Sequence, residues 1–414
     1  MKVLLINPNR FRTPPVPPIG LEYIAESLRN AGDAAEVLDL CFIGEPRSAV
    51  DDAIATVRPE LVGITVRNVD SVLYHSNEFF LDDIRELVAH IRTEHALKVV
   101  VGGAGIKSNP QGILDYLGAD FAIVGPAEGN APACLSAIHR GLSTTRVFRG
   151  MFDPEGRSYR RFSPMDYGRY FDEGGIAGFE THKGCSSSCV YCLEADTPVI
   201  FKNIADVVGE IRRLADAGFT HFHLCDSEFN EDLDFSLEFC AALRASGVRI
   251  RWAAYMKPAN FNRKLLSLMR ETGAYLITLT VDSFRKCPEY WADVEKLVFL
   301  AKSAGIKIAV DFLTGFPQED DELLKWCLDL FGRLQPDSVN INTYLRLYRS
   351  LRIAGIIMSD PESRSRLLGN THDNSLVTPV FYNRLSSKQI RELTGEDPLF
   401  RIEGLTQGVN YLRV

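Results

Sequence analysis

The sequence has no long apolar run and no long basic run. Its N-terminal apolar stretch, residues 3–6, is four residues long, whereas a membrane span needs about 18 apolar residues and a secretory signal about 7–15. The 46 basic and 54 acidic side chains give a net charge of −8, which disfavours a nucleic-acid or anionic-membrane partner. We therefore expect a cytoplasmic protein that binds neither nucleic acid nor membranes.

Cysteine is scarce, with nine residues in 414. The cysteines lack the spacing of a secreted disulfide framework, which fits a reducing compartment. None follows Cys327, so ligand count excludes an iron–sulfur cluster in the C-terminal segment. Residues 1–145 contain only Cys41 and Cys134.

Three cysteines stand together within residues 180–194. Cys185, Cys189 and Cys192 form a C-x3-C-x2-C array. Three thiolates can hold three irons of a [4Fe–4S] cube and leave the fourth iron open for chemistry. A structural zinc site needs four ligands, and a second C-x2-C pair is missing, although His182 could be a fourth ligand. The array therefore predicts an open iron–sulfur cluster, with zinc as the alternative.

Residues 1–145 alternate short apolar strands with amphipathic helices, which predicts an α/β, Rossmann-like doubly wound parallel sheet. Such a sheet binds its ligand beyond the carboxyl ends of its strands. Because no G-x-G-x-x-G follows the first strand, a dinucleotide is disfavoured. The expected strands are residues 3–6, 36–40, 61–66, 98–101 and 121–124.

A second alternation covers residues 176–345. Its six β/α units predict a partial (β/α)6 barrel with its chemistry at the carboxyl ends of the strands. We expect residues 146–175 to form a linker and residues 346–414 to form a short C-terminal cap over the barrel mouth. The expected barrel strands are residues 176–181, 220–224, 250–255, 275–281, 307–313 and 338–345.

Polar residues and a glycine follow three of these barrel strands. Their shared location predicts that they line a site, although Asp and Ser are also common helix caps. The residues are Asp226 and Glu228 after the second strand, Asp282 and Ser283 after the fourth, and Gly315 after the fifth.

Three potential metal ligands also alternate around the second barrel strand. His221, His223 and Cys225 share one strand face. Packing in the interior is the simpler interpretation, and a metal site is the alternative, because no further ligands are apparent.

At residues 180–194, including Tyr191 before the third cysteine, the chain resembles the radical S-adenosylmethionine (SAM) superfamily. The resemblance implies that SAM binds the open iron of a [4Fe–4S] cluster. An external electron donor of flavodoxin or ferredoxin type would then drive cleavage of SAM to a 5′-deoxyadenosyl radical. The residues implied to contact SAM are Tyr191, Asp226, Glu228, Asp282, Ser283 and Gly315.

The first domain resembles the cobalamin-binding domain that precedes the radical SAM core in the B12-dependent class. The likeness rests on a proline-rich loop after the first strand and on glycines after later strands. It departs at residues 125–128, where Gly-Pro-Ala-Glu replaces the usual Gly-Glu-Gly-Glu. The residues implied to contact cobalamin are Asn7, Pro18, Gly20, Leu21, Arg67, Asn68, Gly102, Gly103, Gly125 and Glu128.

The chain lacks the Asp-x-His-x-x-Gly motif that supplies the cobalt-ligating histidine in B12 mutases and methionine synthase. We therefore expect base-off cobalamin with no histidine ligand. Arg67, at the end of the third strand, would lie beneath the corrin and disfavour a lower ligand. The alternative is an ion pair of Arg67 with Asp70 or Glu78.

Together, the resemblances imply a cobalamin-dependent radical SAM methyltransferase that transfers a methyl group from SAM, through methylcobalamin, to a carbon of a small-molecule substrate. Cyclisation, ring contraction or rearrangement with the same cofactors is the first alternative, and a non-catalytic corrinoid sensor is the second. Two-cluster methylthiotransferases need three cysteines in the first domain, which this chain lacks. Residues 346–349 replace the usual Tyr-Pro-Gly-Thr turn, which suggests a specialised substrate end.

Overall fold

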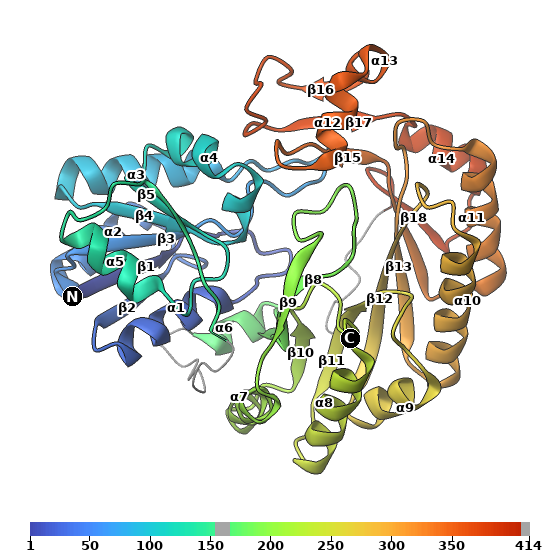
Figure 1. The fold of residues 1–414 in the computed structure, drawn as a ribbon, viewed down its shortest axis with the longest axis horizontal. Helices are drawn as coiled ribbons and strands as arrows, with labels where there is room; N and C mark the ends of the chain where they lie inside the picture. Colours follow the sequence, from blue (N-terminus) through green and yellow to red (C-terminus); the bar gives the residue numbers. More distant parts are fainter. Residues whose placement is uncertain (154–165, 407–414) are drawn as a thin grey trace.

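The computed structural model describes residues 1–153 and 166–406. Two parallel sheets lie beside one another, each covered by helices, and a small antiparallel sheet from the C-terminal segment lies between them at the top of the view (Figure 1). Within the described residues, the helices are too short or too polar to cross a bilayer.

The first sheet has the order β2-β1-β3-β4-β5-β6 and is parallel throughout. The strand order reverses between β1 and β3, which marks the ligand crevice of an open α/β sheet. All five predicted strands form. A sixth, β6, lies in the predicted linker, so the sheet extends beyond residue 145. The strands are β1 (Lys2–Asn7), β2 (Ala34–Asp39), β3 (Leu61–Thr65), β4 (Val99–Gly102), β5 (Phe121–Val124) and β6 (Val147–Arg149).

Helices cover both faces of this sheet because its strands are apolar on both sides. The apolar side chains of α1 and α5 share one buried cluster, and those of α2, α3 and α4 share another on the opposite face. The helices are α1 (Ile19–Asn30), α2 (Pro46–Val57), α3 (Leu81–His95), α4 (Pro110–Leu117) and α5 (Ala131–His139), with a 3-10 turn η1 (Ala104–Ser108) after β4.

The second sheet has the order β18-β14-β13-β12-β11-β10-β7 and is also parallel. All six predicted barrel strands form, and the C-terminal segment adds β18 at the edge beside β14. The strands are β7 (Ala177–Phe179), β10 (His221–Leu224), β11 (Arg251–Met256), β12 (Ala274–Asp282), β13 (Lys307–Leu313), β14 (Ser338–Asn342) and β18 (Phe400–Ile402).

Alternation along the barrel strands separates an outer face from an inner face. Phe222 and Trp252 lie opposite one another and join the large apolar core beneath the helices. His223 lies opposite Ala253, whose side chain belongs to a small cluster on the other face. His223 therefore faces the barrel interior. The covering helices are α7 (Ile204–Asp216), α8 (Leu233–Ala245), α9 (Arg263–Glu271), α10 (Pro288–Ser303) and α11 (Asp321–Leu334).

The remaining elements connect these bodies. The cysteine array lies on an antiparallel hairpin that the sequence pattern did not predict, formed by β8 (His182–Cys185) and β9 (Thr197–Phe201). A short helix, α6 (Tyr167–Asp172), precedes β7. The C-terminal segment forms the sheet β15-β17-β16 and three helices. Its elements are β15 (Tyr344–Arg346), α12 (Arg352–Ser359), α13 (Pro361–Arg364), β16 (Leu367–Gly369), β17 (Val380–Asn383) and α14 (Ser387–Thr394).

A buried ion pair joins the C-terminal segment to the first domain. Arg346 Nε donates to Asp70 Oδ2 at 2.6 Å, and the two side chains are 1% and 0% exposed. The same guanidinium donates to the carbonyls of Leu376 and Val377 at 3.3 and 3.0 Å. The sequence suggests a specialised substrate end at residues 346–349, whereas the donors of Arg346 are engaged in this interdomain contact.

We predict that Asp70→Ala lowers the free energy of unfolding by about 3–5 kcal/mol, because the Arg346 guanidinium would remain buried without its counter-ion. The measurement is the first transition in urea-induced unfolding. Arg244→Ala is the matched control, because Arg244 pairs with Glu271 on the surface and its side chain is 56% exposed; its transition should barely move. Equal shifts in the two variants would contradict the interpretation.

Candidate active site

The three clustered cysteines lie on the β8–β9 hairpin. Cys185 is buried at the end of β8, while Cys189 and Cys192 are half-buried in the connecting loop. Within the described chain, the sulfur atoms of the three cysteines do not all lie within 4.8 Å of one another. Thiolates around one tetrahedral zinc lie about 3.8 Å apart, as follows from Zn–S bonds of about 2.3 Å. The spacing therefore disfavours a single ion.

Backbone geometry places Cys185 at the edge of this hairpin. Gly184 has φ +90°, and a Cβ at this position would lie 2.0 Å from the carbonyl oxygen of Pro198. Only glycine permits this approach of β8 to β9. Burial raises the pKa of Cys185 to about 12 and also raises the pKa of Cys192. Metal binding at these thiols must therefore displace their protons.

A buried carboxylate fixes the start of the cysteine loop. Glu231 accepts hydrogen bonds from Ser186 N at 3.2 Å and from Ser186 Oγ at 2.6 Å. Lys257, which directly follows β11, donates to the same carboxylate at 2.6 Å. These contacts tie the residue after Cys185 to the ends of two barrel strands. This role of Glu231 and Lys257 could not be predicted from the sequence, because neither residue lies in the cysteine motif.

The middle of the cysteine loop is held by residues that follow β12. Arg285 Nη2 lies 3.2 Å from Cys189 Sγ, and Arg285 Nε lies 3.3 Å from Asp282 Oδ2. Tyr191 donates its hydroxyl to the same Asp282 oxygen at 3.1 Å. Burial raises the pKa of Asp282, partly offset by Arg285. The structure thus brings predicted residues Tyr191 and Asp282 together beside Cys189.

Two predicted cofactor contacts make extensive internal hydrogen bonds. Asp226 accepts from Thr181 N at 2.8 Å and from the Thr181 hydroxyl, and lies 3.2 Å from His182 Nδ1. Ser283 is fully buried and donates to Glu319. Both residues stabilise the strand ends through these contacts.

Glu228 differs from Asp226 in its surroundings. One carboxyl oxygen of Glu228 is buried without a hydrogen-bond partner within the described chain. Burial raises the pKa of Glu228 to about 8, and Glu231 contributes to the increase, while Lys257 and Arg285 oppose it. An orphaned buried acceptor at a strand end suits a ligand that can donate a hydrogen bond.

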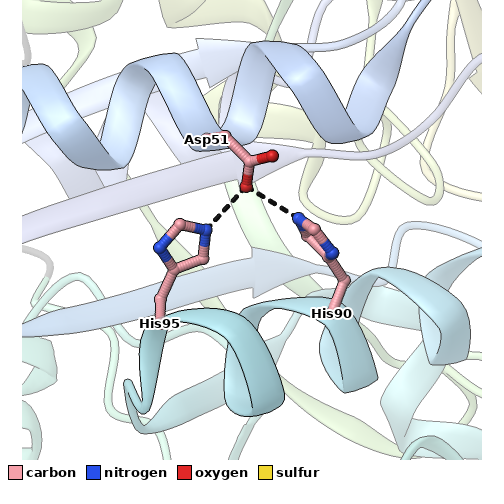
Figure 2. A group of neighbouring side chains, drawn as sticks. All are labelled: Asp51, His90 and His95. Carbon is pink, nitrogen blue, oxygen red and sulfur yellow. Dashed lines mark hydrogen bonds and ion pairs between the residues drawn. The ribbon is translucent and has the colours of Figure 1, made fainter.

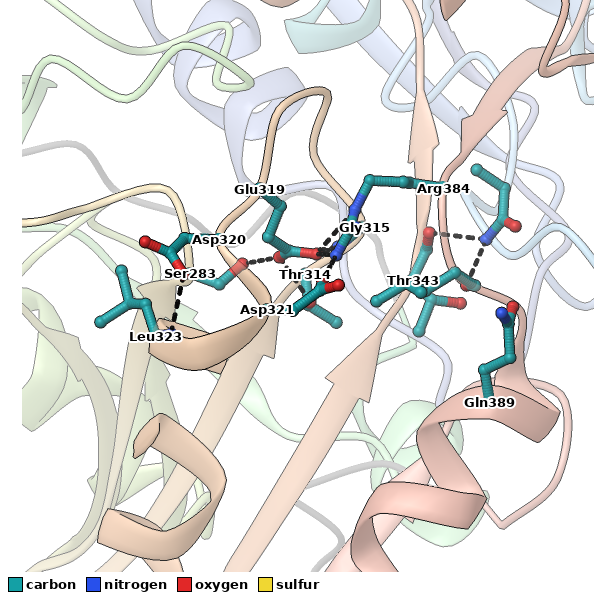
Figure 3. Close-up of polar contacts among 12 residues, drawn as sticks. Ser283, Thr314, Gly315, Glu319, Asp320, Asp321, Leu323, Thr343, Arg384 and Gln389 are labelled. Carbon is teal, nitrogen blue, oxygen red and sulfur yellow. Dashed lines mark hydrogen bonds and ion pairs between the residues drawn. The ribbon is translucent and has the colours of Figure 1, made fainter. Parts of the chain in front are cut away.

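Glu319 organises the end of β13, as Figure 3 shows. Its carboxylate accepts from Thr314 Oγ1 at 2.6 Å and from Gly315 N at 3.0 Å, and Arg384 of the C-terminal segment donates at 2.7 Å. Gly315 has φ +82°, and a Cβ there would lie 2.7 Å from the Thr343 carbonyl. The predicted glycine thus allows a tight turn, and the acid that holds this turn was not singled out from the sequence.

Glycines stand at or near the carboxyl ends of the first-sheet strands and, at two positions, leave open space beside the backbone. Gly125 has φ +90°, and a Cβ at Gly125 or at Gly20 would meet no atom within 4 Å. Gly103 permits close packing, because its Cβ would lie 2.6 Å from the Val66 carbonyl. Gly102, directly before it, ends β4, and Asn68 is exposed. This edge can admit a large ligand close to the backbone.

Three residues that the sequence predicts to contact cobalamin make hydrogen bonds or packing contacts within the protein. Asn7 is buried and donates to Asp39 Oδ1 at 2.8 Å, which joins the ends of β1 and β2. The Pro18 carbonyl accepts from Leu21 N at 2.9 Å in the first turn of α1. The Leu21 side chain is buried in the core between α1 and α5. Through these contacts the three residues support the backbone at this edge of the sheet.

Arg67 forms no ion pair with any described residue, so the alternative pairing with Asp70 or Glu78 is not seen. Asp70 is occupied by Arg346 instead. Burial lowers the pKa of His223 to about 4, and the positive charge of Arg67 contributes to the decrease. Arg67 therefore lies close enough to act electrostatically on the inner face of the barrel.

Two ion pairs connect the hairpin to the loops that follow the first-sheet strands. Lys107 of η1 donates to Glu194, two residues after Cys192, at 2.7 Å. Lys183 of β8 lies 3.4 Å from the buried Glu128, a predicted cofactor contact that follows β5. The hairpin therefore lies directly against the open edge of the first sheet.

The chain matches two family models and a solved structure of a known enzyme. A family model described as the B12 binding domain matches residues 12–135, and one described as the radical SAM superfamily matches residues 179–330. The structure of the radical SAM methyltransferase TsrM from Kitasatospora setae, with cobalamin and a [4Fe–4S] cluster bound, superposes with a TM-score of 0.87 at 25% identity. That match covers 99% of this chain and 93% of the other. The chain is a B12-binding radical SAM enzyme of the methyltransferase type.

Two curated relatives of this B12-binding radical SAM enzyme are themselves methyltransferases. The tryptophan 2-C-methyltransferase of Streptomyces laurentii is 26% identical, with 92% of this chain and 78% of that protein covered. The cytidylyl-2-hydroxyethylphosphonate methyltransferase of Streptomyces wedmorensis is 24% identical, with 76% and 73% covered. The two relatives share a reaction type and differ in substrate.

The structure of this B12-binding radical SAM enzyme fits its three cofactors: cobalamin, a [4Fe–4S] cluster and SAM. The separated cysteines suit a cluster, in which each thiolate binds a different iron. The orphaned oxygen of Glu228 suits the amino group of SAM. The glycine-lined edge of the first sheet, with Gly125 and Gly20 open to their surroundings, suits the bulk of cobalamin.

We predict that Arg285→Ala lowers the reduction potential of the cluster, because Cys189 would lose a hydrogen bond and a nearby positive charge. The expected shift is on the order of tens of millivolts, since about 60 mV corresponds to about 1.4 kcal/mol for a one-electron couple. An EPR-monitored redox titration measures it. Lys286→Ala is the control, because it removes the same charge from an exposed neighbour that pairs with Asp320. A shift of the same size in the control would refute the role of the hydrogen bond.

Proposed function

We propose that this enzyme methylates a carbon atom of a small, polar molecule built on an aromatic amino acid, with tryptophan as the first candidate. The single observation that carries the proposal is the contact between the cysteine hairpin and the open edge of the first sheet, made by Lys107–Glu194 and Lys183–Glu128. This contact supports the proposal, because it would bring the sites expected for SAM and cobalamin next to one another. Such proximity is what a methyl transfer between the two cofactors and a shared substrate requires.

The chemistry of methyl transfer and radical formation would come from the bound cofactors, and the protein would supply orientation. Cys185, Cys189 and Cys192 would hold the cluster, and Arg285 would stabilise the charge on the cluster at Cys189. Glu228 would accept a hydrogen bond from the amino group of SAM. Asp226 and Glu319 would not contact the cofactors, and would instead hold in place the strand ends that carry these contacts.

Arg67 would face the lower side of cobalamin in its base-off form. The support is its position after β3 at the open edge, the absence of an ion pair within the described chain, and its electrostatic effect on His223. A guanidinium stays charged and offers no lone pair to cobalt. It would therefore disfavour a lower ligand without providing one.

The inner face of the barrel supports a polar substrate. Thr280, Asp311 and Asn340 lie on the strand faces that point inward, and Asn340 donates to Asp311 at 3.0 Å. Tyr255 and His223 form an edge-to-face pair there, with ring centroids 5.6 Å apart. Polar groups beside aromatic rings suit an amino acid with an aromatic side chain.

The test is anaerobic turnover of the reconstituted enzyme with SAM, cobalamin, an electron donor of flavodoxin or ferredoxin type, and tryptophan or simple indole and phenyl analogues. We expect a product heavier by one CH2 unit that carries label from methyl-labelled SAM. Cys189→Ala, which removes one cluster ligand, should abolish the product. A modified product without added mass would favour cyclisation or rearrangement and contradict methyl transfer.

We also predict that SAM binding strengthens as pH rises towards about 8. In the enzyme without SAM, Glu228 has a pKa of about 8 and is largely protonated below that pH. The ionised carboxylate accepts the hydrogen bond better, so its proton must leave on binding. The contribution to affinity is up to about tenfold per pH unit below the pKa, because one pKa unit is about 1.36 kcal/mol.

Isothermal titration of the cluster-loaded enzyme with SAM, from pH 6.5 to 9, measures this dependence. Glu228→Gln should make the pH profile shallower, because the amide does not titrate. Glu238→Gln, on the exposed surface of α8, should leave the profile unchanged. An identical slope in Glu228→Gln and the unmodified enzyme would exclude this role.

A further inference from the structure

Two histidines and an aspartate converge on the face of the first sheet opposite α1. Asp51 projects from α2, and His90 and His95 project from the C-terminal part of α3 (Figure 2). Both imidazole Nε2 atoms approach the same carboxylate oxygen of Asp51, at 2.7 Å from His90 and 2.6 Å from His95. The site is separate from the cysteine hairpin, since α1 is the helix that packs towards the barrel through Tyr23 and Glu210.

We propose that Asp51, His90 and His95 bind a divalent transition-metal ion, with zinc as the best match. Their three donor atoms all lie within 4.8 Å of one another, and within the described residues this is the group that meets that condition. Two imidazoles and one carboxylate form the kind of three-residue set that holds zinc with a fourth position open to water. A set with two imidazole nitrogens disfavours magnesium and calcium, which prefer oxygen ligands.

The packing of α2 against α3 holds the ligands in place. Val50 and Ile54, which flank Asp51 along α2, share a buried core with Leu87 and Ile91 of α3. The ligands themselves remain accessible, with exposed side-chain fractions of 44% for Asp51, 17% for His90 and 21% for His95. A rigid base and accessible donors are what a surface metal site needs.

Metal entry requires only a small opening of the group. With metal–ligand distances of about 2.0–2.1 Å, donors around a tetrahedral ion lie about 3.3 Å apart. The distance from each Nε2 atom to the Asp51 carboxylate oxygen must therefore grow by about 0.7 Å from its hydrogen-bonded value. Rotations of the partly exposed side chains can supply this change. The bound ion would cross-link α2 to α3 and stabilise the first domain by mass action.

The probe is zinc alone, added to the 414-residue enzyme after its cluster and cobalamin have been loaded, so that the cysteines are occupied. Competition with a chromophoric chelator gives the affinity. X-ray absorption at the zinc edge gives the ligands. We expect about one zinc per chain, a shell of nitrogen and oxygen at about 2.0–2.1 Å with imidazole outer scattering, and no sulfur at about 2.3 Å.

The test variants are His90→Gln and His95→Gln, in which the amide can still donate to Asp51 and preserve the fold. Each should weaken zinc binding by at least about 100-fold, because losing a direct ligand costs more than the 10–100-fold typical of outer-shell changes. His139→Gln is the matched control: His139 is a surface histidine that lies 3.3 Å from Glu60, and its loss should leave affinity unchanged.

Three results would overturn the proposal. Sulfur in the zinc shell would assign the metal to cysteines. Equal affinity in His90→Gln, His95→Gln and the unmodified enzyme would assign it to another surface. Absence of bound zinc in the loaded enzyme would leave the three residues as a hydrogen-bonded group only. Each result is independent of whether the enzyme methylates a given substrate.

Discussion

The arrangement of the site depends on the half-buried Lys183, which forms ion pairs with both domains. Its ammonium lies 2.7 Å from Glu180 and 3.4 Å from Glu128, one acid from each domain. Burial raises the pKa of Glu180, but Lys183 and Lys202 outweigh this effect and hold it at about 2. A half-buried ammonium without carboxylate partners would be unfavourable. Because Lys183 is two residues from Cys185, docking of the domains also positions the cysteine hairpin.

Carboxylates at the barrel strand ends divide into structural and available groups. Asp226, Glu231 and Glu319 each accept several hydrogen bonds from the neighbouring backbone and side chains. Glu228 has one buried oxygen without such a partner. The saturated acids hold the strand ends rigid, and a rigid frame lets one unsaturated acid discriminate a ligand. The same residue type therefore has two uses, which its surroundings determine.

Local patterns explain which features could be predicted from the sequence. The buried strands of both sheets are short apolar runs between turn formers, and Cys185, Cys189 and Cys192 form a contiguous motif. The β8–β9 hairpin was missed because its strands are short and only partly buried. β18 was missed because it is three residues long and joins the barrel from outside the repeating β/α pattern.

Partners of the site residues were harder to predict, because they are distant in the chain. Glu319 pairs with Arg384, 65 residues away, and Asp70 pairs with Arg346, 276 residues away. No periodicity in a single sequence carries such information. A charged residue at a strand end can be located from the local sequence, whereas the partner that neutralises its charge depends on the tertiary fold.

The pairing of Asp70 with Arg346 has a consequence at the cobalamin edge. Asp70 lies three residues after Arg67 and was the nearest acid in the sequence able to neutralise it. Arg346 engages Asp70 in a fully buried pair and adds hydrogen bonds to the carbonyls of Leu376 and Val377. If Asp70 paired with Arg67 instead, Arg346 would remain buried without a counter-ion, which is strongly unfavourable. The C-terminal segment therefore both holds the domains together and keeps the charge of Arg67 available at the end of β3.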